Sequence, residues 1–383
     1  MLTIETSQSV YSPRFMIGCL GVLFLYCAFV VTFTTEIFDG DINLRTPDIR
    51  SANTFPWEHD DDRRVTRKTA KPQNVGTTQT KEVKRVVITK EPTQEQIYRF
   101  MAEQSEIQSE RKENLAEICR RNSQLTRGGL TYDTLRHIYV HEKTKLLYCF
   151  VPKVACSNWK RVLMKLGGNE KPIDDISSHE AHFRNGMKRL VSYSVEAQNE
   201  KLKSYKKFMF ARNPFTRILS AYKNKYQDPK MYAKETYFHR FAKRIMKKYR
   251  QNPSVHDLMT GEGITWQEFA QYLTDPSEYS SFDDHWEETY RICSPCKISY
   301  NFLGKLETIN EDAKYILRSL NVSDTVTYPP RANSHPTNST KEFDKYYGSL
   351  ETSVLKRLWT IYRIDFELFG YEMPQVLVNR LQK

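Results

Sequence analysis

Two segments of this chain place a short apolar strand, a turn and a helix in direct succession, and they constrain the fold most strongly. Residues 145–151 indicate a strand, which continues through residues 152–158 (the first loop) into a helix over residues 159–166. Residues 207–211 indicate a second strand, followed by residues 212–220 (the second loop), where a helix begins. Strand–turn–helix units predict an α/β fold whose helix N-termini can hold an anion.

Both loops carry side chains that suit phosphate groups. Lys153 supplies a mobile positive charge, although a solvated surface lysine is the alternative interpretation, and Ser157 and Asn158 supply donors and candidate helix caps. Arg212 and Ser220 lie about two helical turns apart, so both could reach one phosphate. The glycine-rich Walker pattern is absent from both loops, which argues against an ordinary nucleoside triphosphatase.

The first loop also carries a family resemblance. The string VPKVACSNWKRVLM resembles the 5′-phosphosulfate loop of the Golgi carbohydrate sulfotransferases, which include the chondroitin 4-O- and HNK-1 sulfotransferases. The resemblance implies that Lys153 contacts the bridging oxygen of the sulfate donor 3′-phosphoadenosine-5′-phosphosulfate (PAPS). It also implies that the rest of this loop surrounds the phosphosulfate: Pro152, Val154, Ala155, Cys156, Ser157 and Asn158.

The second loop resembles the 3′-phosphate motif of the same family, R-x-P-F-x-R-L-x-S-A-Y. Its proline, Pro214, suits the first turn of a helix because that position needs no N–H donor. The resemblance implies that Arg212 and Ser220 hold the 3′-phosphate of PAPS. We interpret Arg217 as a structural residue rather than a ligand contact.

Further motifs resemble the chondroitin 4-O-sulfotransferase branch. They are His-Trp at 285–286, C-x-P-C at 293–296 and Y-x-x-x-G-K-x-E-T at 300–308, and the similarity extends over residues 120–374. The resemblance implies a P-loop-kinase-like α/β domain, with a central parallel sheet flanked by helices and PAPS at the carboxyl ends of the strands. The implied reaction moves sulfate to O4 of N-acetylgalactosamine in chondroitin, a glycosaminoglycan, and needs no metal.

Other functions stay open from the residues. The acceptor could be dermatan or an HNK-1-type glucuronic acid, and the chain could instead be a non-catalytic Golgi protein that binds polyanions. A kinase-like phosphotransferase is disfavoured, because the sequence shows neither Walker glycines nor a clear carboxylate for Mg²⁺.

Sulfate transfer to a hydroxyl requires a general base, and histidine titrates in a suitable range. His285 is the first candidate, although a histidine beside Trp286 is also typical of a packed, hydrogen-bonded residue. The further candidates are His179 and His182, with Glu307 as an alternative base or acceptor ligand.

Positive charge is concentrated in one segment. The formal net charge is +12, and residues 201–250 alone hold 16 Lys or Arg against two acidic residues. This concentration favours an anionic partner, for which we expect an acidic glycan and not nucleic acid. The alternative for residues 238–249 is an amphipathic helix with a solvated charged face.

The N-terminal part indicates a membrane anchor and a stem. Residues 15–33 contain no charge and no proline and are long enough, at about 1.5 Å per residue, to span a bilayer core. A cleaved signal peptide is the alternative, which we disfavour because the apolar run is longer than usual for one and no clear small-residue cleavage site follows Phe33. We predict a cytoplasmic tail at 1–14, a Golgi signal-anchor at 15–33, a lumenal stem at 34–122 and a lumenal sulfotransferase domain at 123–383. A charged helix could form over residues 95–121, within that stem.

Two sequons, at Asn321 and Asn338, agree with a lumenal domain that carries glycans. Cys293 and Cys296 could form half a zinc site, a redox pair or a tight disulfide, and we favour a structural role because no second pair completes four zinc ligands. Cysteine pairing and homo-oligomerisation stay undecided at this level.

Overall fold

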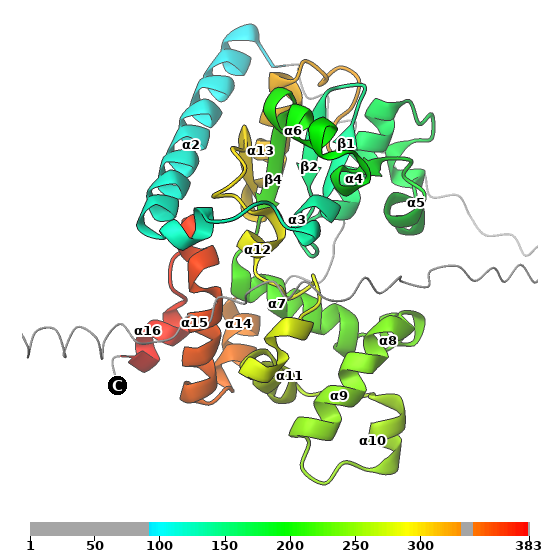
Figure 1. Ribbon diagram of the computed structural model, residues 1–383, viewed down its shortest axis with the longest axis vertical. Coiled ribbons are helices and arrows are strands. Elements are labelled where there is room, and N and C mark those ends of the chain that lie inside the picture. Colours follow the sequence, from blue (N-terminus) through cyan, green and yellow to red (C-terminus); the bar gives the residue numbers. More distant parts are fainter. Residues whose placement is uncertain (1–91, 331–339, 382–383) are drawn as a thin grey trace, which may run out of the picture. The chain divides into compact units, whose positions relative to one another are not determined.

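A five-stranded sheet organises the part of the chain that the computed structural model describes, which is residues 92–330 and 340–381 (Figure 1). The strand order is β3-β1-β2-β4-β5. The strands are short, and their bounds are β1 Ile138–His141, β2 Leu146–Cys149, β3 Lys188–Arg189, β4 Lys206–Ala211 and β5 Phe302–Lys305. The two predicted strands that precede the loops are β2 and β4, and they are neighbours in the sheet.

The sheet is mixed, so the prediction of a parallel sheet is correct only for the three strands β2, β4 and β5. β2, β4 and β5 are parallel, whereas β1 pairs antiparallel with both β2 and β3. The reason is the short connection between β1 and β2, where the N–H of Lys145 donates to the carbonyl of Glu142 at 3.2 Å. A tight turn can join only antiparallel strands, because a parallel connection needs a crossover of a dozen or more residues.

Helices cover the sheet and also build a second layer away from it. The helices of the first half are α2 Gln94–Arg121, α3 Tyr132–Arg136, α4 Cys156–Gly167, α5 Ser178–Phe183, α6 Val195–Ser204, α7 Pro214–Tyr222, α8 Pro229–Lys234 and α9 His239–Tyr249. Those of the second half are α10 Val255–Thr260, α11 Trp266–Leu273, α12 Thr289–Cys293, α13 Ile309–Ser319, α14 Thr340–Gly348, α15 Thr352–Leu368 and α16 Gln375–Leu381. Between α7 and α8 lies a π-helical turn, η4 Lys223–Gln227.

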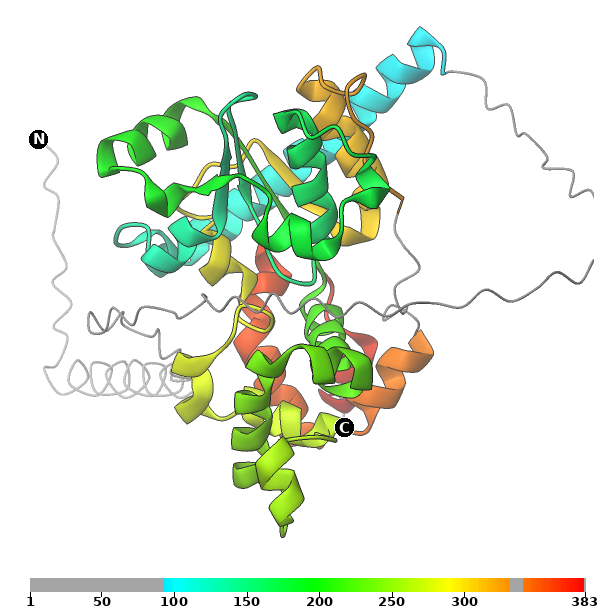
Figure 2. The ribbon, with the colours of Figure 1, turned by 90° about the vertical axis from the view of Figure 1, so that its right-hand side faces the viewer.

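Two hydrophobic cores result from this arrangement. One surrounds the sheet and contains buried residues of β1, β2, β4, β5, α4 and α13. The other lies among α7, α9, α11, α14 and α15 and contains a dense group of aromatic rings around Trp286. In Figures 1 and 2 the sheet occupies one half of the described molecule and these helices the other. Helix α7, which follows β4 directly, leads the chain from the part that contains the sheet into the part that contains the second core.

Helix α2, predicted within the stem, packs against strand β5 and helix α13. Its Gln108 side chain pairs with the backbone of edge strand β5, accepting from the N–H of Leu303 at 2.8 Å and donating to its carbonyl at 3.1 Å. Arg111 donates to the same carbonyl and to Asp312. The helix therefore covers a sheet edge, and a stem that extends to residue 122 does not fit these contacts.

Two disulfide bonds attach the C-x-P-C motif to other elements. Cys296 is bonded to Cys119 of α2, and Cys293 is bonded to Cys149 at the end of β2. This pairing excludes the zinc and redox alternatives and the disulfide within the motif, and it gives both cysteines a structural role. Cys156 is a free, buried thiol. Among the described residues, no group of three or more His, Cys, Asp or Glu could hold a metal ion.

The predicted tail and anchor lie outside the described residues. Within residues 92–330 and 340–381, no helix has the length and apolar character that crossing a bilayer requires. Asn321 lies exposed in the turn after α13, and Asn338 lies outside the described residues. The predictions of an anchor and of glycosylation therefore stay predictions.

Candidate active site

The first loop bends sharply between β2 and α4. Lys153 and Ala155 both adopt left-handed backbone conformations, with φ of +68° and +53°, which non-glycine residues rarely do. Such strain is typical of functional loops. The bend holds the N-terminus of α4 open, and the first N–H groups of a helix have no acceptor within it. Within this loop, the side chains of Val154 and Cys156 are buried, so they attach the loop to the protein interior.

Ser157 and Asn158 do not cap this helix, contrary to our prediction. The residue at the cap position is Ala155, and α4 has no capping hydrogen bond from a side chain. Ser157 Oγ lies 2.7 Å from His182 Nε2, and Asn158 Oδ1 accepts from Arg161 at 2.8 Å. The left-handed turn at Ala155 places both residues inside the first turn of the helix, where their side chains can contact neighbours.

The second loop lies against the first. The buried Arg212 side chain donates from Nη1 to the carbonyl of Lys153 at 3.0 Å and from Nε to Thr216 Oγ1 at 3.2 Å. Ser220 is partly exposed on α7, two turns beyond Arg212. The two predicted phosphate-binding loops are therefore joined by a hydrogen bond from the arginine predicted to bind the 3′-phosphate.

Arg217 has the structural role that its position suggested. Its guanidinium is fully buried and donates to three backbone carbonyls, those of Pro152 at 3.1 Å, Asp284 at 2.6 Å and Glu287 at 2.6 Å. It therefore fixes the start of the first loop relative to the turn that carries His285.

Lys153 lies among other positive charges. Its ammonium donates to Asn224 Oδ1 at 2.9 Å. Burial, together with the nearby charges of Lys225 and Arg212, lowers the pKa of Lys153 to about 7. Lys225 is itself buried and forms an ion pair with Glu235. A cluster of cations that depresses a lysine pKa in this way is suited to an anionic ligand, which would restore the charged form.

Asn224 and Lys225 were missed as site residues by sequence reasoning, which treated them as part of the basic segment. A signal was present, because Asn224 follows Ser220 by four residues and so continues its helix face into η4.

His285 is arranged as a base. Its Nδ1 lies 2.6 Å from Asp283 Oδ1, which also accepts from the His285 backbone N–H at 3.0 Å. Because the carboxylate can only accept, the proton resides on Nδ1 and Nε2 is left as an acceptor. Burial lowers the pKa of His285, with smaller contributions from Lys225 and Lys153. A neutral imidazole beside Lys153 is the form that can take a proton from a hydroxyl.

His182, an alternative candidate, is arranged as a donor instead. Lys160 Nζ lies 3.0 Å from His182 Nδ1, and an ammonium has no lone pair, so Nδ1 accepts. The proton therefore resides on Nε2 and is donated to Ser157 Oγ. Burial, followed by the charge of Lys160, lowers the pKa of His182 to about 3. The remaining histidine, His179, is exposed and packs on Phe183.

Glu307, the other alternative, holds the second loop in place. Its Oε1 accepts from the backbone N–H of Asn213 at 3.0 Å, and its Oε2 accepts from the Tyr371 hydroxyl at 2.8 Å. Both oxygens are therefore engaged on the side of the second loop.

Much of the basic segment is neutralised inside the protein, which weakens the interpretation of residues 201–250 as a polyanion surface. Six of its cations form ion pairs with carboxylates: Lys201 with Glu142, Lys223 with Glu342, Lys225 with Glu235, Arg244 and Lys248 with Glu278, and Arg250 with Glu268. The charge count of a segment therefore overstates the charge available to a ligand.

The site as a whole combines two adjacent strand–loop–helix segments, a lysine among other cations and a histidine whose pKa is lowered. This combination is suited to an enzyme that transfers a group from an anionic donor to a hydroxyl.

The comparisons with known proteins identify the family. Residues 136–372 match the model of the sulfotransferase family, and this chain belongs to that family. Carbohydrate sulfotransferase 11 of Rattus norvegicus is 38% identical over 275 residues, which cover 70% of this chain and 76% of that protein. Carbohydrate sulfotransferase 8 of Mus musculus is 34% identical, with coverage of 70% and 64%, and carbohydrate sulfotransferase 12 of Xenopus laevis is 32% identical, with coverage of 75% and 74%. No solved structure matches the chain. The protein is therefore an enzyme that transfers sulfate to a carbohydrate.

The geometry of His285 predicts the effect of His285→Gln. We expect kcat to fall by about 10²–10⁴-fold, the usual contribution of a general base, while the affinity for the sulfate donor stays unchanged. Because the pKa of His285 lies below its usual 6.5, wild-type activity should fall only as pH drops below that value, when the imidazole is protonated. His179→Gln is the matched control and should leave kcat unchanged. If His285→Gln keeps the wild-type decline at acid pH, His285 is not the base.

The contact between Lys160 and His182 predicts the effect of Lys160→Met. The lysine is buried and its Nζ lies 4.4 Å from the centroid of the Phe150 ring, so methionine fits the same space. Without the ammonium the pKa of His182 should rise above about 3, while burial, the larger cause, still holds it below its usual range. Histidine NMR should then show His182 titrating at a higher pH in the variant than in the wild type, with Lys165→Met as the control. The same titration midpoint of His182 in both proteins would contradict a direct contact with the Lys160 ammonium.

Proposed function

We propose that this enzyme transfers the sulfuryl group of PAPS to O4 of N-acetylgalactosamine in chondroitin. The observation that carries the proposal is the convergence of Lys153 and Arg212, from the two loops, with Lys225 of η4 beside His285, whose pKa is lowered. The motif resemblance supports PAPS as the donor, and the same resemblance favours chondroitin among acidic glycans.

The loops fit such a donor at both of its anionic ends. The start of α4, with Ser157, offers N–H and hydroxyl donors to a 5′-phosphosulfate, and Lys153 adds a positive charge there. Arg212 and Ser220 would hold the 3′-phosphate, for which the planar guanidinium is well suited. The hydrogen bond from Arg212 to the carbonyl of Lys153 joins the two loops, which supports binding of both ends of one donor molecule.

The residues then divide the chemistry between them. His285 Nε2 takes the proton of the acceptor hydroxyl as its oxygen forms a bond to sulfur. The bond between sulfur and the bridging phosphate oxygen breaks, and Lys153 stabilises the negative charge that develops on that oxygen. The products are the sulfated sugar and 3′,5′-ADP. Asp283 keeps the imidazole in the required tautomer and stabilises its positive charge.

We also propose a Golgi location, with a single membrane-spanning anchor at residues 15–33 and the enzyme in the lumen. The support is the uncharged apolar run, the sequons and the two disulfides, because disulfides form and persist in oxidising compartments.

The experiment that tests the function is transfer of labelled sulfate from PAPS by the purified lumenal part of the chain, residues 92–383. The acceptors are desulfated chondroitin, dermatan, heparosan and a glucuronyl-lactosamine glycan, followed by disaccharide analysis. Label at O4 of N-acetylgalactosamine is the expected result, and label at another position would overturn the acceptor. Absence of label on every glycan, from folded protein that binds PAPS, would favour a glycan-binding protein.

The pKa of Lys153 predicts a pH dependence of PAPS binding. In the free enzyme this pKa is about 7, and bound anions should raise it, so above pH 7 binding must take up a proton. The Kd for PAPS should therefore rise about tenfold per pH unit between pH 7 and 9. Calorimetry in buffers of different ionisation enthalpy measures the proton uptake directly.

Lys153→Arg is the matched control, because a guanidinium stays charged over this range and the pH dependence should disappear. Lys153→Ala should lower kcat more than it weakens PAPS binding. Equal losses in both quantities would contradict the role of Lys153 at the leaving oxygen.

A further inference from the structure

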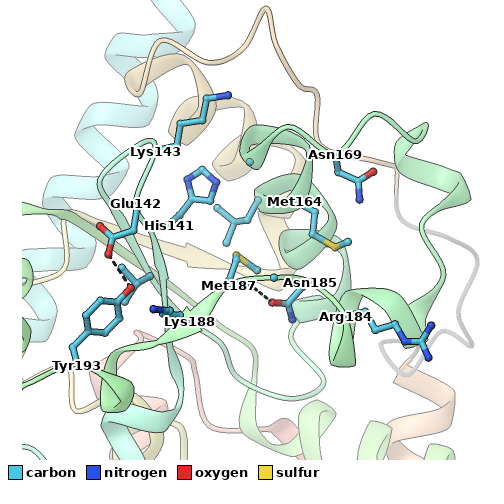
Figure 3. A pocket seen from close by; sticks show the side chains of 14 residues that line it. His141, Glu142, Lys143, Met164, Asn169, Arg184, Asn185, Met187, Lys188 and Tyr193 are labelled. Carbon is cyan, nitrogen blue, oxygen red and sulfur yellow. Dashed lines mark hydrogen bonds between the residues drawn. The ribbon is translucent and has the colours of Figure 1, made fainter.

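A cavity of about 530 Å³ lies beside the sheet, and none of the proposed catalytic residues lines it. Its walls come from three places: the end of β1 and the turn after it, the second half of α4, and residues 184–188, which lead into edge strand β3 (Figure 3). Leu163, Met164 and Met187 form an apolar surface inside it. The cavity is open to one side, so a chain longer than one sugar can enter without threading.

The rim of this cavity is positively charged. Lys143, Arg184 and Lys188 are exposed and line it, and among the described residues none of them forms an ion pair with a carboxylate. In Figure 3 Lys143 and Arg184 lie at opposite ends of the group. These three cations contrast with Lys201, Lys223 and Lys225, each of which forms an ion pair with a glutamate of the protein.

The one carboxylate in the lining does not compensate this charge. Glu142 accepts from the Tyr193 hydroxyl at 2.8 Å and forms an ion pair with Lys201 at 2.9 Å. A hydrogen bond from Tyr205, with further ones from Lys201 and Tyr193, lowers the pKa of Glu142 to about 2. Its negative charge is thus held by groups on α6 and beside it, and the rim keeps a positive balance.

Neutral donors complete the lining. Asn169 Oδ1 accepts from the backbone N–H of Lys171 at 3.0 Å, which leaves the amide NH₂ group for a further acceptor. The Tyr193 ring adds a flat face near Lys188. Cations, an amide donor and apolar faces are the groups that bind the carboxylates, hydroxyls and ring faces of an acidic sugar.

The cavity is connected to the active site by two elements. Helix α4 begins at the first loop and reaches the cavity with Met164, seven residues after Ser157, which is about 10 Å along the helix axis. The second connection is the chain after α5, since His182 contacts Ser157 and Arg184 lines the cavity. One polymer could therefore occupy the active site and this cavity together.

We propose that this cavity is a distal subsite for an acidic glycan chain, where Lys143, Arg184 and Lys188 bind carboxylates of sugars some residues away from the sulfated one. The proposal rests on the acidic-glycan acceptor proposed above. The subsite holds the polymer and takes no part in the chemistry, so it lowers KM for long acceptors without changing kcat.

The test compares a long desulfated chondroitin chain with a chondroitin tetrasaccharide as acceptors. For the triple variant Lys143→Gln, Arg184→Gln, Lys188→Gln, we expect KM for the long chain to rise about 5- to 20-fold, as three exposed ion pairs would give. The kcat, the KM for PAPS and the KM for the tetrasaccharide should stay unchanged. Met187→Trp, which fills the cavity without changing its charge, should likewise raise only the KM for the long chain.

The matched control removes three exposed lysines elsewhere, Lys230, Lys234 and Lys243, and thus lowers the net charge equally. An equal rise of KM in this control, an equal rise for the tetrasaccharide, or no rise at all would overturn the subsite. A rise of KM in the triple variant that is seen only with protein-linked chains would overturn the glycan subsite and assign the cavity to a protein partner instead.

If the wild type sulfates none of the acceptors, the proposed function fails separately. Fluorescence anisotropy of the labelled long chain then still tests the subsite, because equal binding by wild type and triple variant would overturn it.

Discussion

The buried guanidinium of Arg217 is the interaction on which the arrangement of the site depends. It joins the carbonyl that precedes Lys153 to the two carbonyls that flank His285 and Trp286, and thus connects two segments of the chain that are far apart in sequence. An arginine in this place costs desolvation, which lowers its pKa, and the cost is offset because three carbonyls receive charge-assisted hydrogen bonds. A lysine could not direct donors in the same planar fork. The first loop and the turn that carries His285 are thus held in position by one side chain.

The rest of the site follows from the position of α7 between the two hydrophobic cores. Because α7 starts at the carboxyl end of β4 and continues into η4, one stretch of chain supplies Arg212, Arg217, Asn224 and Lys225. The π-helical turn shifts the register after Tyr222, and Lys225 lies buried next to Lys153 instead of in solvent. Irregular turns of this type are frequent at functional sites. The basic character of this stretch therefore has two sources: charges that build the site and charges that internal carboxylates neutralise.

Local patterns were sufficient to predict the strands before both loops, the helices after them and the structural role of Arg217. These features depend on residues close in sequence, or on motifs that already carry spatial information. The pairing of β3 with β1, the packing of α2 on β5 and the disulfides between distant elements depend on long-range contacts that no local period encodes. The same limit applies to Ser157, since its bond to His182 forms only once α5 has folded back on α4.

The two histidines beside the first loop illustrate why residue type alone does not assign a catalytic role. His285 and His182 are both partly buried and both have lowered pKa values, so neither burial nor charge separates them. Their partners do: a carboxylate at Nδ1 of His285 leaves Nε2 as an acceptor, whereas an ammonium at Nδ1 of His182 makes Nε2 a donor. The opposite tautomers give the site one group that accepts a proton and one that directs the Ser157 hydroxyl oxygen. Since that oxygen accepts from His182, its own proton is free to point toward a further acceptor. The hydroxyl at position 157 is therefore a directed donor, which explains in physical terms why the loop carries serine and not alanine there.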